Sequence, residues 1–254
     1  MATTAIILAA GKGTRMESDL PKVLHPVCGR PMLAYVLDTA RQAGSSRLLV
    51  VVGYRAELVK QTFAADTDAE NISWVLQSPQ MGTGHAVMVC KSELAGLDGL
   101  VLVLAGDGPL IRPETLRQLI DTHQATGAAC TLATSILPEP GGYGRILRDA
   151  AGNLVGIVEA LDATAEQKAI HEVNVSIYCF DAAALRDVIA RLKNDNTKGE
   201  YYLTDALGLL ASDGRKIAAV AAVPPQDVLS INTLDELQNV SDIMAARMAA
   251  EGVR

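Results

Sequence analysis

The chain has 254 residues, which is enough to bury one large α/β core or two smaller ones. Hydrophobic residues make up 49% of it and aromatic residues only 4%, a composition typical of buried aliphatic strands packed against helices. The net charge of -7 argues against nonspecific nucleic-acid binding, so a local basic patch would have to attract any anionic ligand.

Cysteine spacing and the lengths of the apolar runs exclude further classes of protein. The four cysteines are scattered without a C-x-x-C pair, and the four histidines are also dispersed, so we expect reduced thiols and no His/Cys metal site. The N-terminus has no basic leader, and no apolar run approaches the length of a membrane span. We therefore expect a cytoplasmic protein with no membrane partner.

Apolar runs alternate with amphipathic segments in the first half of the chain. Buried strands are predicted at residues 5–10, 48–52, 72–76 and 100–104. Helical patterns follow these runs at residues 31–42, 55–63, 82–94 and 113–126. This alternation favours a doubly wound α/β fold with a mostly parallel sheet and right-handed crossovers.

The second half of the chain predicts a smaller antiparallel addition. Closely spaced strands are expected at residues 128–135, 144–147, 154–159 and 173–180. Ala151-Gly152-Asn153 is a plausible hairpin turn between two of them. Further elements are expected at residues 182–192 and 203–211 (helices), 216–223 (a strand) and 234 to about 250 (a last helix). We expect residues 1–233 to form one domain with two lobes and residues 234–254 a C-terminal helix.

The strand predicted at residues 5–10 runs directly into a Gly-rich loop. Gly11 and Gly13 can turn backbone N–H groups toward an oxyanion, and Lys12, Arg15 and Lys22 supply positive charge. The loop matches neither the Walker A nor the dinucleotide-binding spacing, so the glycines alone are equally typical of a plain strand-to-helix turn. With these basic residues, phosphate binding is the better interpretation.

Two more strand ends carry candidate ligands. The strand at 100–104 leads into Gly106-Asp107-Gly108, and a single carboxylate beside phosphates suits Mg²⁺, although Asp is also common in tight turns. Gln77 follows the strand at 72–76 and can read the edge of a base, while Gly82 allows a flat base to approach the backbone. For the segment from Gln77 to Gly82, the alternative interpretation is an ordinary helix start capped by Thr83.

These motifs together resemble one family, the uridylyltransferase domain of the bifunctional bacterial enzymes that make UDP-N-acetylglucosamine. The resemblance runs from Ala5 to the C-terminus and rests on L-A-A-G-K-G-T-R-M with S-D-L-P-K-V-L-H, Q-x-x-Q-x-G-T-G-H-A, G-D-x-P-L-I, G-Y-G-R-I, I-V-E-x-x-D-A-T and G-E-Y-Y-L-T-D. Each motif alone is modest evidence for the family, but their order and spacing together are highly specific.

The resemblance implies a reaction and a set of site residues. The reaction is UTP plus N-acetylglucosamine 1-phosphate giving UDP-N-acetylglucosamine and pyrophosphate, with Mg²⁺ as cofactor. Residues implied to contact the nucleotide are Leu8, Ala9, Ala10, Gly11, Lys22, Gln77, Gly82 and Thr83. Arg15 and Lys22 would meet the phosphates, and Asp107 with Asn232 would hold the metal. Residues implied on the sugar side are Gly144, Glu159, Asn174 and Asn232.

The chain departs from the family pattern mainly on the acceptor side. Ala105 stands where an aromatic residue is common, and Gly108 where Val or a similar residue is usual. Leu161 replaces a Lys that meets the sugar phosphate in related enzymes, a charge-assisted contact worth roughly 1.5–3 kcal/mol. Ser176 follows Asn174-Val175 where Asn-Thr-Gly is usual.

These departures keep three hypotheses open. The first is the reaction above, the second is the same chemistry on another sugar 1-phosphate, and the third is a catalytically weak nucleotide-sugar binding protein. Retention of Arg15, Lys22, Asp107 and Asn232 argues against the third. The family's hexapeptide repeats would begin near Arg254, so we expect no acetyltransferase domain, and the oligomeric state stays open.

Overall fold

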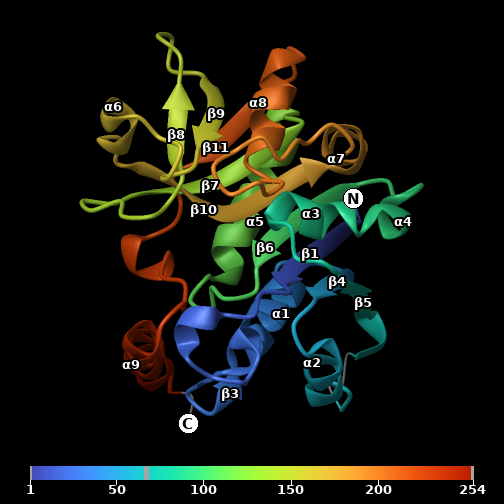
Figure 1. The fold of residues 1–254 in the computed structure, drawn as a ribbon, viewed down its shortest axis with the longest axis vertical. Coiled ribbons are helices and arrows are strands. Elements are labelled where there is room, and N and C mark those ends of the chain that lie inside the picture. The colour runs from blue at the N-terminus through green and yellow to red at the C-terminus, as the bar shows by residue number, and fades with distance from the viewer. Residues whose placement is uncertain (1, 66–68, 253–254) are drawn as a thin grey trace.

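One central sheet carries the candidate residues on its strand ends (Figure 1). The computed structural model describes residues 2–65 and 69–252. The strand order along the sheet is β11-β7-β10-β6-β1-β4-β5. The bounds of these strands are β1 Thr3–Ala9, β4 Arg47–Val52, β5 Ile72–Leu76, β6 Leu100–Ala105, β7 Cys130–Ile136, β10 Glu172–Asp181 and β11 Ile217–Val220.

The sheet is parallel on one side and mixed on the other. β1 lies between β4 and β6 and runs parallel to both, and β5 extends this parallel half beyond β4. β10 is antiparallel to β6 and β7, while β11 returns parallel to β7. The predicted doubly wound, mostly parallel sheet is therefore confirmed.

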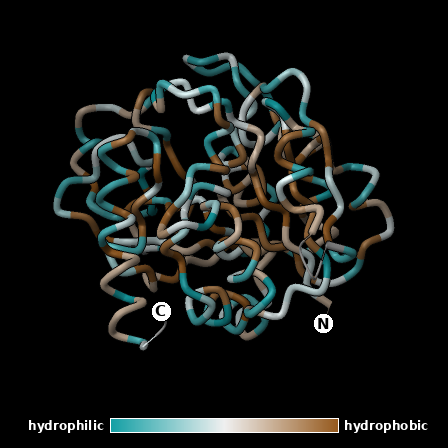
Figure 2. The backbone as a smooth tube through the Cα atoms, turned by 90° about the horizontal axis from the view of Figure 1, so that it is seen from below, coloured by the Kyte–Doolittle hydropathy of each residue, from teal (hydrophilic) through white to brown (hydrophobic). Residues whose placement is uncertain are grey.

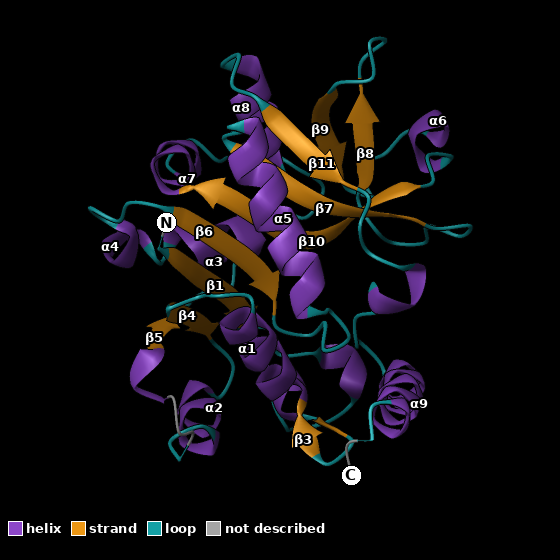
Figure 3. Ribbon diagram, turned by 180° about the vertical axis from the view of Figure 1, so that it is seen from behind, coloured by secondary structure: helices purple, strands orange, loops and turns teal. Residues whose placement is uncertain are grey.

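Helices cover both faces of the sheet because side chains of successive strand residues point to opposite sides. Along β1, Ala5 and Ile7 belong to one core cluster and Ile6 to the other. The first cluster packs against α1 Met32–Gln42, α2 Ala56–Thr62, α5 Pro113–Thr126 and α9 Leu234–Ala250 (Figure 3). The second packs against α3 Thr83–Met88, α4 Lys91–Leu94, α7 Ala182–Ile189 and α8 Asp205–Ser212. Figure 2 shows the hydrophobic backbone segments gathered inside and hydrophilic ones outside.

The smaller antiparallel lobe is a hairpin attached to β10. β8 Arg145–Arg148 pairs with β9 Leu154–Val158, and Arg145 also pairs with Val173 of β10. The turn closes where the Asp149 N–H donates to the Asn153 carbonyl at 2.9 Å, and Gly152 has φ 84°. This confirms the predicted hairpin turn. α6 Ala165–Lys168 joins the lobe to β10.

Several short elements and one helix boundary differ from the sequence prediction. The helix expected at 82–94 is two helices, because a tight bond from the Cys90 N–H to the Val87 carbonyl ends α3 before α4 begins. Unpredicted short elements are β2 Pro26–Val27, β3 Arg30–Pro31, η1 Thr14–Met16, η2 Lys22–Leu24, η3 Ala69–Asn71 and η4 Pro225–Asp227. Elements of two or three residues carry no periodicity that could predict them. Within the described ranges, no helix has the length and apolarity needed to cross a bilayer.

Candidate active site

A cavity of about 250 Å³ opens at the carboxyl ends of the parallel strands. Its lining includes most of the residues that sequence analysis placed on the nucleotide and metal side, namely Leu8, Ala9, Ala10, Gly11, Lys22, Gln77, Gly82, Thr83 and Asp107. It also includes four residues that were not predicted, Val23, Gln80, Ala86 and Glu200. The carboxyl edge of a parallel sheet is where α/β proteins bind ligands.

Strand register brings the Gly-rich loop beside the Gly-Asp turn. Leu8 near the end of β1 pairs with Ala105 at the end of β6. Beyond β6, the Gly106 N–H donates to the Leu8 carbonyl at 2.9 Å. Asp107 therefore follows directly beside the loop, as expected if the two strands are neighbours.

Lys22 joins the two predicted metal ligands. Its Nζ donates to Asp107 Oδ2 at 2.5 Å and to Asn232 Oδ1 at 2.7 Å. The Lys22 and Asp107 side chains are 12% and 23% exposed, so the pair is largely screened from solvent. A carboxylate oxygen and an amide oxygen thus converge on one positive charge.

The backbone fixes Asn232 in this position although it lies far from Asp107 in the sequence. The Ile231 N–H donates to the Asp107 carbonyl at 3.1 Å. Asn232 Nδ2 donates to Ser230 Oγ at 3.2 Å, which leaves Oδ1 facing Lys22. Next in the chain, Thr233 and Glu236 form a capping box that begins α9.

The loop conformation requires glycine next to Lys22. Gly13 has φ 69°, and a Cβ built there would lie 2.7 Å from the Lys22 Cβ. The buried Met16, 1% exposed, anchors the following turn. Arg15 is exposed and does not line the cavity, while Lys12 Nζ lies 5.3 Å from the centroid of the Tyr54 ring.

Gln77 is buried with its amide nitrogen already engaged. Two contacts hold its side chain. Nε2 donates to the Gly82 carbonyl at 3.0 Å and lies 3.2 Å from His85 Nδ1. The residue is only 4% exposed. Both amide hydrogens are thus occupied, and Oε1 is left as an acceptor. This places an acceptor, with no competing donor, at the wall of the cavity.

The interpretation of Thr83 as an ordinary helix cap is wrong. Gly82 is the N-cap of α3, and no side chain caps it. The Thr83 hydroxyl instead accepts from the Leu203 N–H at 3.1 Å. Thr83 therefore ties α3 to a distant segment of the chain.

The segment around Tyr201 closes over the start of α3. The Gly84 N–H donates to the Tyr201 carbonyl at 2.7 Å, and the Tyr201 N–H donates to the Met81 carbonyl at 2.8 Å. A Cβ on Gly82, whose φ is 100°, would lie 2.6 Å from the Tyr201 oxygen. Glu200 enters the cavity wall through this contact. In the sequence, only the family motif G-E-Y-Y-L-T-D, which contains Glu200 and Tyr201, indicated that this segment has a role.

Three of the four residues predicted on the sugar side form a second cluster outside the lining of this cavity, while the fourth, Asn232, lies at Lys22. The Asn174 N–H donates to the Gly144 carbonyl at 2.9 Å, and a Cβ on Gly144 would lie 3.6 Å from Glu159 Oε2. Asn174 is 4% exposed and donates through Nδ2 to the Tyr178 hydroxyl at 2.7 Å. These three predicted residues therefore lie together.

Glu159 is held by a residue that sequence analysis missed. The Thr204 hydroxyl donates to Glu159 Oε1 at 2.9 Å. Burial raises the pKa of Glu159, and the bond from Thr204 opposes that shift. Ser176, where glycine is usual in the family, has φ 57°, and Leu161 is 62% exposed.

Comparison with known proteins identifies the family of the chain. Over residues 5–196 the chain matches the family model of the MobA-like NTP transferase domain. It is 48% identical over 247 residues to the bifunctional protein GlmU of Geobacter metallireducens and 44% identical over 244 residues to that of Clostridium acetobutylicum. These alignments cover 97% and 96% of this chain but 51% and 52% of the relatives, so the chain spans about half their length.

A structural comparison supports the fold. A crystal structure of UDP-glucose pyrophosphorylase complexed with UDP-glucose has a TM-score of 0.80 at 20% identity, covering 97% of this chain and 100% of that one. At that identity the likeness establishes the fold alone. The family model covers well over half of the sequence, and the chain therefore belongs to the MobA-like NTP transferase domain family.

Proposed function

We propose that this chain transfers the uridylyl group of UTP to N-acetylglucosamine 1-phosphate and releases pyrophosphate, giving UDP-N-acetylglucosamine. The observation that carries the proposal is the cavity in which the Gly-rich loop, Gln77 and Asp107 meet. The identity of 44–48% to bifunctional GlmU proteins supports the choice of substrates. We further propose that residues 1–233 form the two-lobed transferase unit and residues 234–254 its C-terminal helix.

On the donor side, the engaged amide of Gln77 supports uracil binding. Because its Nε2 is bonded to Gly82 and His85, Oε1 would accept from the N3–H of uracil. Gly82 and Thr83 would hold the base from the same wall, and the strand end from Leu8 to Gly11 would contact the uridine. Cytosine lacks a hydrogen at the equivalent ring nitrogen, so this arrangement favours uracil.

The reaction requires that the sugar phosphate and UTP be aligned and that the negative charge of their phosphates be neutralised. An oxygen of the sugar phosphate attacks the α-phosphorus of UTP, the bond from that phosphorus to the bridging oxygen breaks, and pyrophosphate leaves with the electron pair. The attacking phosphate is already ionised at neutral pH, so the step needs neither a side-chain nucleophile nor a general base. Lys22 and Arg15 would neutralise the reacting phosphates and the leaving pyrophosphate.

The residues present fit Mg²⁺. Asp107 Oδ2 and Asn232 Oδ1 converge on one cationic atom, Lys22 Nζ, and both are oxygens of the kind that Mg²⁺ prefers. Among the described residues, no cluster of three or more His, Cys, Asp or Glu side chains could form a full metal cage. Mg²⁺ usually takes one or two protein ligands and completes its shell with water and phosphate oxygens. When bound, it would neutralise charge on the phosphates.

The acceptor sugar would bind at the second cluster. Glu159 would accept hydrogen bonds from sugar hydroxyls, while Asn174 and the neighbouring backbone at Gly144, both buried in the free chain, would meet the acetamido group or another hydroxyl. Asn232 would lie between the two clusters. Because Leu161 brings no positive charge, another sugar 1-phosphate is the alternative acceptor.

The test is pyrophosphate release from UTP and Mg²⁺ across a panel of sugar 1-phosphates. We expect release with N-acetylglucosamine 1-phosphate at least tenfold faster than with glucose 1-phosphate or glucosamine 1-phosphate. Faster release with one of the other sugars would replace the acceptor and keep the reaction class. UTP binding without release on any sugar would refute the enzyme assignment.

A further inference from the structure

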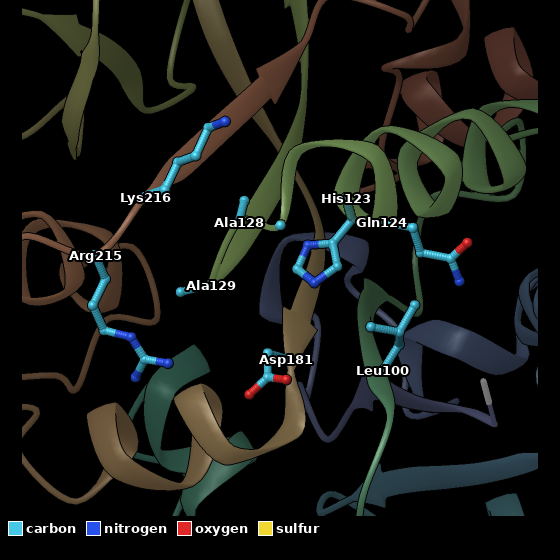
Figure 4. A pocket seen from close by; sticks show the side chains of 9 residues that line it. Leu100, His123, Gln124, Ala128, Ala129, Asp181, Arg215 and Lys216 are labelled. Atoms are coloured by element: carbon cyan, nitrogen blue, oxygen red, sulfur yellow. The ribbon is translucent and has the colours of Figure 1, made fainter.

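A second and larger cavity lies at the opposite edge of the sheet. Its volume is about 720 Å³, and its lining includes Leu100 at the start of β6 and Asp181 at the end of β10 (Figure 4). β6 runs from this cavity toward Asp107, so the two places are separated by roughly 20 Å at about 3.3 Å per strand residue. None of the residues proposed above to bind substrates lines it.

The floor of this cavity is formed by residues that leave room for a ligand. Gly127, Ala128 and Ala129 connect α5 to β7 and contribute no side chain beyond a methyl group. The cavity is bordered by α5 on one side and by the start of β11 on the other. The lining holds no Phe, Tyr or Trp that could stack on a base, so a nucleotide is a poor fit.

Arg215 supplies a positive charge to the lining, and, after the hydrogen bond from Arg191, its charge also lowers the pKa of Asp213. Its guanidinium has no hydrogen-bond partner within the described part of the chain. The nearby carboxylate of Asp213 is engaged by Arg191, which donates to it twice, at 2.5 and 3.0 Å. The neighbouring Lys216 bonds the Thr126 carbonyl at 3.0 Å and keeps two further N–H donors. In a chain of net charge -7, this local excess favours an anionic group.

Asp181 and His123 supply the groups that could bind a hydroxyl of the ligand. Asp181 Oδ1 accepts from the Ala184 N–H at 3.0 Å, which leaves Oδ2 for a ligand. His123 is 3% exposed, with Nδ1 lying 3.0 Å from the Thr131 hydroxyl, so only its other ring nitrogen is left for the cavity. Burial lowers the pKa of His123, which keeps the ring neutral at neutral pH. A carboxylate beside a guanidinium and a neutral imidazole suits a ligand that has both an anion and hydroxyl groups.

We propose that this cavity binds a small sugar monophosphate, with its phosphate on Arg215 and a sugar hydroxyl on Asp181. Inorganic phosphate shares the charge, but its only donors are its own acidic P–OH groups, whereas a sugar adds neutral hydroxyls that can donate to Asp181. The proposal does not depend on the proposed function, because no substrate-site residue takes part.

Histidine NMR tests the proposal, because the four histidines report on different places. His123 lines the second cavity, His85 contacts Gln77 in the first, and His171 lies just before β10 near the acceptor cluster. Glucosamine 6-phosphate and inorganic phosphate would be titrated separately into the full chain carrying ¹³C-labelled histidine. The His123 signal is assigned by its loss in His123→Asn.

With glucosamine 6-phosphate we expect a saturable shift of the His123 signal and none at His85 or His171. Arg215→Gln should weaken binding at least fivefold, while Lys193→Gln, which removes the same charge from an exposed position, should leave it unchanged. Asp181→Asn keeps a good helix cap, and should weaken binding of the sugar phosphate more than binding of inorganic phosphate. These variants are compared with the unmodified chain, whose own titration tests the location even if a variant fails to fold.

Three results would overturn the proposal. The first is an unmoved His123 signal at saturating ligand, and the second is a shift confined to His85 or His171. The third is an affinity that Arg215→Gln leaves unchanged. Equal affinity for inorganic phosphate would overturn the assignment of a sugar ligand.

Discussion

The two clusters of the candidate site differ in charge and in how they are held. The donor side has Lys12, Arg15 and Lys22 on one loop at the end of a buried parallel strand. The acceptor side lies on the antiparallel lobe and the adjoining start of α8, where burial raises the pKa of Glu159 and of Asp205, and the charge of Glu159 raises the pKa of Asp205 further. An acidic surface suits hydroxyl groups but repels a phosphate. Under the proposed function, the phosphate of the acceptor would therefore be met by cations from the donor side.

The difference bears on one departure from the family pattern, the exposed Leu161. Strands on the donor side are buried on both faces, so their ends are fixed by the core. The acceptor lobe is a hairpin attached to β10, and its loop residue Leu161 is exposed. A substitution at an exposed position such as Leu161 costs little stability, whereas one at the buried Asn174 would cost more.

Removing the donor-side carboxylate should have the largest effect. Asp107→Ala should lower kcat by about 10³-fold, because Lys22 would keep its charge but the oxygen ligand for Mg²⁺ would be lost. The measurement is pyrophosphate release at saturating substrates, with unfolding in urea as a check on the fold. Asp121→Ala, an exposed position on α5, is the matched control. Near-normal turnover of Asp107→Ala would make the proposed metal site wrong.

A pair of glycine variants separates close packing from backbone strain. Both Gly82 and Gly152 have positive φ, but only Gly82 has an atom in the way of a Cβ, the Tyr201 oxygen at 2.6 Å. We expect Gly152→Ala to cost about 1 kcal/mol of unfolding free energy and Gly82→Ala about 3 kcal/mol. Urea unfolding measures both. Equal costs would mean that the segment at Tyr201 moves away from α3 without penalty.

The Tyr201 contact also marks what sequence could and could not predict. The alternation of strands and helices followed from periodicity, and strand order placed Asp107 beside the Gly-rich loop. The bonds from Gly84 and Thr83 to the chain near Tyr201 join residues more than a hundred positions apart. No local pattern encodes such a contact, so Glu200 and Thr204 were missed. Asn232 was assigned through the family resemblance alone.

Restoring a cation on the acceptor side should have a smaller effect. Leu161→Lys should lower the KM for the sugar 1-phosphate by about fivefold, because a contact made by an exposed side chain is worth about 1 kcal/mol. The KM for UTP should not change. Leu58→Lys adds the same charge at an exposed position on α2 and is the control. An unchanged KM for the sugar would mean that position 161 does not face the acceptor.

The smallest effect should come from the carboxylate at the start of α8. Burial, followed by the charges of Glu159, Asp195 and Asp162, raises the pKa of Asp205 to about 6. Its raised pKa means that the folded state holds this proton more tightly than the unfolded chain. The stabilisation is fully present below the unfolded carboxyl pKa and is lost as pH rises through about 6.

Asp205→Asn should therefore raise the unfolding free energy at pH 7.5 by about 1 kcal/mol, after allowance for solvent screening at this half-buried position. At pH 3.5 most of this difference should be gone, because the parent carboxyl is then protonated in the folded state and mostly protonated in the unfolded chain. Urea unfolding at the two pH values gives the difference. Asp121→Asn, with its exposed carboxylate, should show no such pH dependence. If Asp205→Asn is not more stable at pH 7.5, the acidic cluster imposes no electrostatic cost, and its repulsion of the acceptor phosphate must be weak as well.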